Sequence, residues 1–319
     1  MRTPCYWKDK NLVSFLLLPL GSIYAGLTAL RFKFKKSKKA EKPVICIGNL
    51  TAGGTGKTPT AVSIAQIAKE LGYKPMFISR GYGGKLCGVM VDKNKHTPYD
   101  VGDEPLLLAK EADVSINHNR ALAAQKAIEN GADILIMDDG FQNPGLQKDI
   151  SFLVFDGGIG VGNGYPVPAG PLRESFAKGL KRANAAIIIG EDKTNLKEKL
   201  GDMPIFYGKM KSYELPENCG KLIAFAGIGR PEKFYNSLQE LGANIIKTFD
   251  FPDHHFYSEK ELKELIDMAW KEDADLITTA KDFVKIPQDL QHHFKVLEIE
   301  IEWQDKESLR DFIKTGLKN

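Results

Sequence analysis

Five short runs of apolar residues recur along the first two thirds of the chain and predict buried β-strands. They lie at residues 44–47, 76–78, 134–137, 152–155 and 186–189. Runs that are apolar at every position, rather than at alternate positions, are typical of strands covered on both faces. Helical patterns such as residues 60–68 separate them. We therefore predict an α/β fold with a parallel-sheet core over residues 43–205.

A second alternation of strands and helices follows this core. Residues 205–212 have the pattern of a strand and residues 213–220 that of a polar turn, which we interpret as a linker over residues 206–220. Strand patterns then recur at residues 222–226, 245–249, 275–279 and 295–303, with helical patterns between them. This order predicts a smaller α/β domain over residues 221–319, whose loops face a crevice shared with the first domain.

The N-terminal segment, residues 1–42, has a different pattern. Residues 11–30 carry no charge, and a basic block at residues 31–39 follows at once. Twenty uncharged, mostly apolar residues are about the length needed to span a bilayer core, and the positive charge that follows predicts that the body of the protein lies on the cytoplasmic side. A cleaved signal peptide is disfavoured because its basic residues would precede the apolar run. A spanning helix and a helix lying in the membrane interface both remain open, and Pro19, Gly21, Ser22 and Gly26 favour a kinked or shallow segment.

The N-terminal segment also differs from the rest of the chain in its net charge. Residues 1–42 hold ten Lys and Arg against Asp9 and Glu41, a net charge of +8, whereas the whole chain has a net charge of +3. A basic arm can bind an anionic membrane or a nucleic acid, but the rest of the chain is mildly acidic and offers no wider basic face. We therefore expect a membrane contact and no nucleic-acid partner. The four cysteines are widely spaced, as expected for free thiols in a reducing compartment.

The most informative stretch is the glycine-rich segment at residues 48–59, which lies between a predicted strand and a predicted helix. This context predicts a phosphate-binding loop whose backbone amides surround the phosphates of ATP. Lys57 would reach the β- and γ-phosphates and the Thr58 hydroxyl would ligate Mg²⁺. The predicted ATP-binding residues are Thr51, Ala52, Gly53, Gly54, Thr55, Gly56, Lys57 and Thr58. Thr51 stands where the common pattern has Gly, and Ala52 stands where a related ATPase class has a second Lys.

Carboxylates in two places are candidates for the chemistry beside this loop. Asp138 and Asp139 end an apolar strand, which is the usual position of the second nucleotide motif, and we predict that they hold Mg²⁺. Asp103 and Glu104 precede a helical pattern. Their spacing is compatible both with simple helix capping and with Mg²⁺ binding or proton transfer.

Two further stretches carry candidate functional residues. Asp253, His254 and His255 follow a predicted strand, and they are either ordinary loop residues or a carboxylate-oriented histidine. The long Gly- and Pro-rich segment at residues 162–174 is either a rigid surface connection or a functional loop.

Several motifs taken in order resemble one known family, the tetraacyldisaccharide 4′-kinases of lipid A biosynthesis. The motifs lie at residues 48–59, 79–83, 102–105, 138–142, 168–174, 227–231, 251–255 and 279–285. The resemblance implies transfer of the γ-phosphate of ATP to the 4′-hydroxyl of a lipid disaccharide 1-phosphate, to form lipid IVA. It also implies attachment to the cytoplasmic face of the inner membrane, and it indicates no obligate protein partner. One departure is Ala280, where an acidic residue is expected.

The resemblance also suggests roles for individual residues. It implies that Asp103 works with a histidine of the 251–255 motif, taken as His254, although His255 is not excluded by sequence. Glu104 would assist Mg²⁺ and Gln142 would contact the nucleotide or the metal. Arg80, Arg120 and Arg173 are candidates for the anionic end of the acceptor.

The alternative function is a membrane-recruited P-loop ATPase switch of the partitioning or targeting kind. Such proteins share the phosphate loop and the strand that ends in Asp. They usually need the second lysine that Ala52 replaces, and they tend to carry an amphipathic membrane helix rather than a continuously apolar one.

Overall fold

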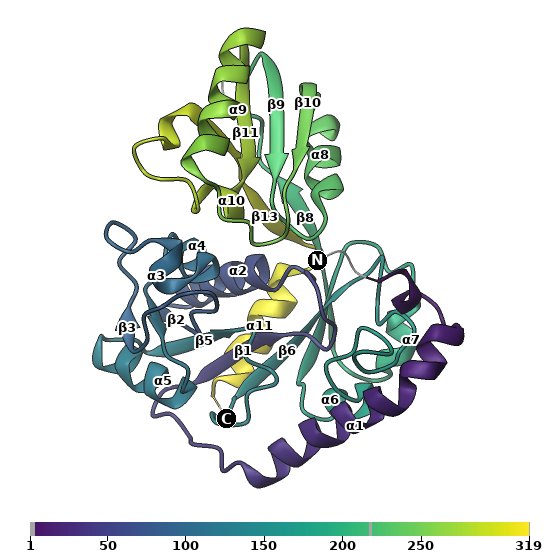
Figure 1. The fold of residues 1–319 in the computed structure, drawn as a ribbon. Helices are drawn as coiled ribbons and strands as arrows, with labels where there is room; N and C mark the ends of the chain where they lie inside the picture. Colours follow the sequence, from purple (N-terminus) through teal and green to yellow (C-terminus); the bar gives the residue numbers. More distant parts are fainter. Residues whose placement is uncertain (1–3, 217–218, 319) are drawn as a thin grey trace.

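The computed structural model describes residues 4–216 and 219–318, which form two sheets (Figure 1). A nine-stranded sheet has the order β13-β8-β7-β6-β1-β5-β2-β4-β3, and a four-stranded sheet has the order β10-β9-β11-β12. We refer to the parts built on them as the large and the small domain. This arrangement confirms the predicted α/β class with a parallel core and a second, smaller α/β unit.

The large sheet is parallel except at its two edges. Its strands are β1 (Val44–Gly48), β2 (Pro75–Ser79), β3 (Val89–Met90), β4 (Val114–Ile116), β5 (Ile134–Asp138), β6 (Ile150–Asp156), β7 (Ala185–Ile189), β8 (Ile205–Ser212) and β13 (Ile299–Trp303). Only β3, on β4, and β13, on β8, run antiparallel to their neighbours. Every residue of β1, β2, β5, β6 and β7 is buried, as the continuous apolar runs predicted.

Helices cover both faces of this sheet and build two apolar clusters. One face packs against α2 (Lys57–Glu70), α4 (Asp103–Leu108) and α11 (Lys306–Gly316), with the short α3 (Pro98–Val101) beside them. The other face packs against α5 (Arg120–Glu129), α6 (Phe176–Leu180) and α7 (Leu196–Leu200). Because β1 lies between β5 and β6 in the middle of the sheet, the loop that follows it emerges at the centre of the domain.

The small domain repeats the same layering on a smaller scale. Its strands are β9 (Lys221–Ala226), β10 (Asn244–Asp250), β11 (Ala274–Thr279) and β12 (Phe294–Leu297), all parallel. Its helices are α8 (Pro231–Glu240), α9 (Glu259–Glu272) and α10 (Ala280–Phe283), with a 3₁₀ turn at Gln291–His293. The Ser258 hydroxyl and the Glu261 carboxylate form a reciprocal capping box at the start of α9.

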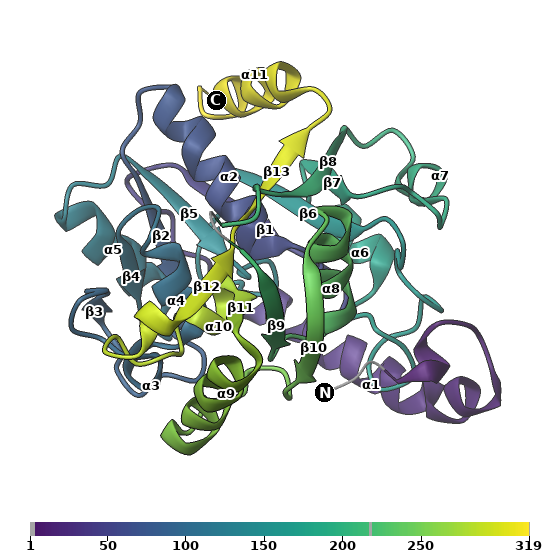
Figure 2. The same cartoon turned by 90° about the horizontal axis from the view of Figure 1, so that it is seen from above.

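The C-terminal residues depart from the predicted domain boundaries. The strand expected at residues 295–303 divides into β12 in the small sheet and β13 in the large one, and Figure 2 shows the chain passing directly from one to the other. Helix α11 then buries Leu309 and Ile313 in the core of the large domain. The predicted small domain of residues 221–319 is therefore wrong at its C-terminal end, because β13 and α11 belong to the large domain. The connection between domains consists of two antiparallel strands, β8 and β13.

Helix α1 (Leu12–Phe34) follows a short 3₁₀ turn at Cys5–Trp7 and lies along the outside of the large domain (Figure 1). It runs unbroken through Pro19. Gly21 is buried where the helix meets the 162–174 loop, and a Cβ placed on it would lie 2.8 Å from the Pro166 carbonyl oxygen. Among the described residues, α1 is the one helix long and apolar enough to cross a membrane by length and composition.

Candidate active site

The predicted phosphate loop connects the buried strand β1 to helix α2. Gly53 and Gly56 have φ values of +113° and +88°, a region that residues with a Cβ rarely adopt. Gly56 is also the N-cap of α2, and a Cβ there would lie 2.6 Å from the Met210 side chain. Lys57 and Thr58 occupy the first turn of α2. The first turn of a 14-residue helix thus faces the loop with its free amide groups, as phosphate binding requires.

The 162–174 segment, which had no assigned role in the sequence, supports this loop directly. The Ala52 amide donates to the Pro171 carbonyl at 2.7 Å, and the Arg173 amide donates to the Leu50 carbonyl at 2.7 Å. Within the phosphate loop, the buried Asn49 amide group donates to Thr55 Oγ1 at 3.1 Å. The 162–174 loop therefore supports the predicted phosphate loop, which favours a functional loop over a simple surface connection.

Gln142 contacts the backbone at the start of the phosphate loop. Its Nε2 donates to the Asn49 carbonyl at 2.8 Å and to Glu174 Oε1 at 3.1 Å. Gln142 therefore supports the backbone that leads into the loop. The nucleotide or metal contact expected for Gln142 stays a prediction.

Asp138, at the end of β5, lies beside Thr58. The Thr58 hydroxyl donates to Asp138 Oδ2 at 3.0 Å, whereas Oδ1 is buried and has no hydrogen-bond partner among the described residues. Burial raises the pKa of Asp138 to about 7, and Glu104 and Asp139 add to this rise. A bound cation would relieve both features, because it would supply a partner for the free oxygen and offset the crowded negative charge.

These residues fit a magnesium ion. Among residues 4–216 and 219–318, no cluster of three or more His, Cys, Asp or Glu side chains could hold a metal by itself. Mg²⁺, however, is commonly held by one or two protein oxygens together with substrate phosphates and water. The Thr58 hydroxyl and the Asp138 carboxylate supply such hard oxygen ligands next to the phosphate loop.

Asp139 is oriented differently from its neighbour. Its backbone has a φ of +47°, and its carboxylate accepts from Arg173 Nη1 at 2.9 Å and lies 3.9 Å from Lys57 Nζ. Burial tends to raise the pKa of Asp139, but the charges of Lys57 and Arg173 outweigh it, so the pKa lies below its ordinary value. The metal-ligand role predicted for Asp139 is not tested by these contacts. The contacts show that the Asp139 carboxylate pairs with the side chains of Arg173 and Lys57.

Asp103 and Glu104 begin helix α4 at the edge of the same site. Asp103 Oδ1 accepts from the Glu104 amide at 3.0 Å, but the N-cap of α4 is Gly102 and has no side-chain cap, so simple capping does not account for this pair. Burial raises the pKa of Glu104, against the charge of Lys281, and the nearby Asp103 and Asp139 raise it further. Glu104 thus belongs to the same cluster of carboxylates as Asp138, which favours the active-site interpretation of the pair.

His254 reaches Asp103 across the boundary between the two domains. His254 Nδ1 lies 2.9 Å from Asp103 Oδ2, and its Nε2 lies 3.2 Å from Lys281 Nζ. A lysine ammonium can only donate, so Nε2 accepts and the neutral ring carries its proton on Nδ1, directed at Asp103. Burial raises the pKa of Asp103, but the His254 hydrogen bond and Lys281 outweigh it and leave the pKa below its ordinary value. The bond with Asp103 in turn raises the pKa of His254.

His255 has a separate and local environment. Its Nε2 lies 3.0 Å from Glu261 Oε1, and its ring stacks on Phe251 with the ring centroids 5.0 Å apart. It therefore helps to fix the start of α9. Of the two adjacent histidines, the structure brings His254 to Asp103.

The sequence did not assign a role to Lys281, which lies at the centre of this contact. Its Nζ is 3.4 Å from Asp253 Oδ1 and 4.0 Å from Asp103 Oδ2, in addition to its contact with His254. Lys281 follows β11 in the 279–285 motif, just as His254 follows β10. Its position after a parallel strand of the small domain is the signal that could have identified it.

The three arginines predicted to meet the acceptor lie in different places. Arg173 pairs with Asp139. Arg120 is buried at the start of α5, where burial lowers its pKa to about 10 and its Nε has no partner among the described residues. Arg80, just after β2, is exposed. Their roles toward an acceptor remain predictions.

A phosphate loop on a central parallel strand, with a carboxylate and a threonine placed for Mg²⁺, defines a P-loop nucleotide-binding enzyme, and the Asp–His pair beside it is an arrangement suited to a kinase. The family model described as tetraacyldisaccharide-1-P 4′-kinase (LpxK) matches residues 13–318. The chain belongs to this family, which confirms the resemblance noted in the sequence.

Individual relatives agree with this assignment. Tetraacyldisaccharide 4′-kinases from Parvibaculum lavamentivorans and Rhodospirillum rubrum are 46% and 43% identical, over 90% and 94% of this chain and 87% and 93% of theirs. A crystal structure of the "apo" form of LpxK from Aquifex aeolicus in complex with ATP is 27% identical, with a TM-score of 0.81. It covers 96% of this chain and 100% of its own. These relatives are named as kinases, and none of these findings supports the ATPase switch.

Proposed function

We propose that this chain transfers the γ-phosphoryl group of ATP to the 4′-hydroxyl of a tetraacyldisaccharide 1-phosphate, with Asp103 and His254 as the groups that handle the acceptor hydroxyl. Family membership supports the reaction. The observation that carries the residue roles is the Asp103–His254 contact, which joins the two domains beside the phosphate loop.

The chemistry follows from the placement of these groups. The 4′-oxygen forms a bond to the γ-phosphorus, the bond from that phosphorus to the β–γ bridging oxygen breaks, and ADP leaves. Since the transition state of such transfers is loose, positioning and charge neutralisation contribute more than a strong base does. Asp103, ionised at neutral pH, aligns the hydroxyl and accepts its proton, and His254 holds the carboxylate in place.

Lys57 and the loop amides bind the phosphates of ATP in this proposal. Bound Mg²⁺ would neutralise phosphate charge, held by Thr58 and Asp138, with Asp139 and Glu104 nearby as predicted. Lys57 Nζ lies 3.9 Å from Asp139 Oδ1. Because Lys57 belongs to the loop, it would pair with a bound phosphate in place of Asp139. The phosphate loop comes from the large domain and His254 from the small one, so the site is complete only while the two domains are held together, as they are here.

The reaction is tested by incubating the full chain, in detergent micelles, with γ-labelled ATP and purified disaccharide 1-phosphate, with and without Mg²⁺. We expect labelled bisphosphorylated lipid only with Mg²⁺. Vigorous ATP hydrolysis without labelled lipid, in several detergents, would instead favour the ATPase switch.

The residue roles are tested with Asp103→Asn and His254→Ala, and with His255→Ala as the matched control. We expect kcat to fall about 10²- to 10⁴-fold in the first two variants, with little change in ATP affinity. His255→Ala should keep its kcat, because the ring of His255 contacts Glu261, Phe251 and Tyr257, all in the small domain. Loss of ATP affinity with an intact kcat in either of the first two variants would place that residue in the nucleotide site and refute the pair.

We further propose that α1 lies in the interface of the cytoplasmic face of the inner membrane and presents the enzyme to its lipid. Two observations support this placement. Leu12, Leu16, Leu20, Ile23 and Leu27 are all more than half exposed, although Gly21 is packed on the large domain. The basic block follows the apolar run directly, which suits an anionic leaflet.

The membrane contact is tested by flotation with vesicles that contain anionic phospholipid. The double variant Leu16→Glu/Leu20→Glu should lower the fraction of protein bound to vesicles at least about tenfold, because two exposed leucines would no longer enter the lipid. The control is Trp270→Glu, at a residue that is 78% exposed on α9 of the small domain. Equal loss in both variants would mean that binding does not depend on α1.

A further inference from the structure

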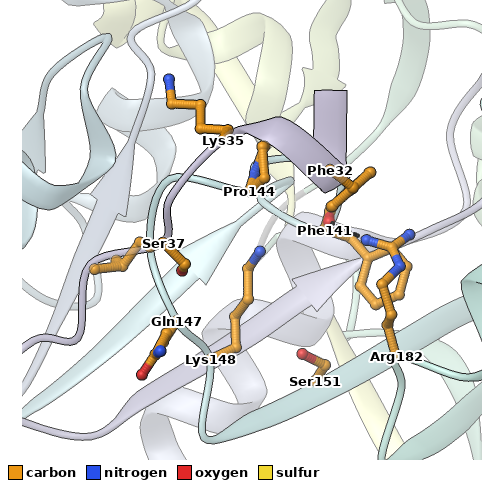
Figure 3. A pocket seen from close by; sticks show the side chains of 10 residues that line it. Phe32, Lys35, Ser37, Phe141, Pro144, Gln147, Lys148, Ser151 and Arg182 are labelled. Atoms are coloured by element: carbon orange, nitrogen blue, oxygen red, sulfur yellow. Dashed lines mark hydrogen bonds between the residues drawn. The ribbon is translucent and has the colours of Figure 1, made fainter. Parts of the chain in front are cut away.

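Arg182, in the loop between α6 and β7, contacts helix α1. Its guanidinium carbon lies 3.8 Å from the centroid of the Phe32 ring on α1 and 4.6 Å from that of Phe141. Its Nη1 also donates to the Phe141 carbonyl at 3.4 Å. Figure 3 shows the Arg182 side chain beside Phe141, with Phe32 next to them at the end of the helix. The guanidinium is thus in contact with two aromatic rings, one of which belongs to α1.

The same guanidinium is linked to the phosphate loop on its other side. Arg182 Nη2 forms an ion pair with Glu174, whose side chain is only 5% exposed. Glu174 accepts from Gln142, and Gln142 donates to the carbonyl of Asn49 at the start of the phosphate loop. A continuous series of contacts therefore runs from Phe32 on α1, through Arg182, Glu174 and Gln142, to the loop that is proposed to bind ATP.

The end of α1 that carries Phe32 lies beside two open surface pockets. They have volumes of about 210 and 220 Å³, and Phe32 and Arg182 line both. The contact between Phe32 and Arg182 is one of those that hold this end of α1 on the large domain. Loss of the ring would expose the guanidinium to water and weaken its attraction to Glu174.

We propose that Arg182 is a positioning residue that couples the seating of α1 on the large domain to the order of the phosphate loop. The proposal rests on the proposed function, because it takes this loop as the ATP site and α1 as the membrane helix. With α1 seated, Phe32 shields Arg182, which holds Glu174 and Gln142 against Asn49. With α1 displaced, Gln142 loses its restraint and the loop binds ATP more weakly. ATP binding is thereby favoured when α1 is in its docked position.

The test measures Mg²⁺–ATP affinity of the full chain in detergent micelles, without acceptor, by titration calorimetry. Phe32→Ala should weaken ATP binding about three- to tenfold and leave kcat at saturating ATP nearly unchanged. Phe34→Ala is the matched control, because Phe34 lies on the same helix, is 75% exposed and has no ring contact with Arg182 among the described residues. Arg182→Lys keeps the charge but loses the planar group, so it should also weaken ATP binding while preserving the fold.

A double variant distinguishes coupling from two separate effects. If Phe32→Ala and Gln142→Ala act through the same contacts, the double variant should lose little more ATP affinity than the more affected single variant. Additive losses would refute the series of contacts, and so would a Phe32→Ala protein that binds ATP as the unaltered chain does. If Phe32→Ala does not fold, Arg182→Lys decides the question by the same criterion. An unaltered chain that phosphorylates no lipid would instead refute the proposed function.

Discussion

At the residue scale, the site is organised by opposite charges that restrain one another. Arg173 and Lys57 lie at Asp139, and Lys281 lies among Asp253, His254 and Asp103. Such neighbours lower the pKa of Asp103 and Asp139, so both carboxylates stay ionised at neutral pH. The pKa values of Asp138 and Glu104 are raised instead, chiefly by burial.

Lys281 provides a prediction at this scale. Lys281→Met keeps most of the side-chain volume but removes the donor to His254 Nε2, so the ring is no longer held with its Nδ1 proton toward Asp103. We expect kcat to fall about ten- to a hundredfold with Mg²⁺–ATP affinity unchanged, as measured by steady-state kinetics and by titration. Lys260→Met, at a lysine whose side chain is 86% exposed on α9, is the control. A weaker affinity with normal kcat would assign Lys281 to nucleotide binding instead.

At the element scale, loops rather than helices bring the functional groups together. The phosphate loop is supported by the 162–174 loop, and that loop also receives α1 at Gly21. The same loop accepts a hydrogen bond from the Trp7 indole at the Pro168 carbonyl. One segment therefore contacts both the predicted phosphate loop and helix α1.

Alanine substitution at two glycines of α1 distinguishes the effect of packing against the 162–174 loop from the effect of helix propensity. Gly21→Ala places a Cβ 2.8 Å from the Pro166 carbonyl oxygen, whereas Gly26→Ala meets nothing within 4 Å. Alanine in a helix is favoured over glycine by about 0.5–1 kcal/mol, so Gly26→Ala should raise thermal stability slightly. Gly21→Ala should lower it, because α1 must move away from the loop. Thermal unfolding in detergent measures both, and equal shifts in the two variants would show that the close approach at Gly21 does not matter.

At the scale of the whole molecule, the two domains are joined by β8 and β13 and by ion pairs across their boundary. Asp156, at the end of β6, pairs with Arg230 and, at 2.7 Å, with Lys233, which lie at the start of α8. The Asp103–His254 contact crosses the same boundary from different elements. Together they restrain the small domain in the position that brings His254 to Asp103.

This restraint predicts a rescue by charge exchange. Asp156→Arg should lower kcat about tenfold or more, because like charges would then face each other across the domain boundary. Adding Arg230→Asp to that variant should restore part of the activity, since the attraction returns with its sign exchanged. Steady-state kinetics on both variants and on Arg230→Asp alone are the measurement. A double variant no better than the single ones would argue against an ion pair that positions the domains.

The order of elements and much of the site could be predicted from the sequence because the relevant signals are local. The continuous apolar runs of β1, β5 and β6 specify buried parallel strands, and glycines before Lys57 specify a phosphate loop, whatever the rest of the chain does. The position of Asp138 beside the loop could be predicted for the same reason, since it ends a recognisable strand. The pairing of Asp103 with His254 was predicted from a family resemblance rather than from such a signal.

Contacts between distant segments were decided only by the tertiary structure. The period of the pattern at residues 295–303 is the same whether the strand joins the small sheet or the large one, so the division between β12 and β13 depended on the β8 edge being available. The choice between His254 and His255, the place of Lys281 and the contact between Arg182 and Phe32 depend on how loops from separate strands meet. A sequence specifies which side chains each element can present, whereas the packing of the elements determines which of them touch.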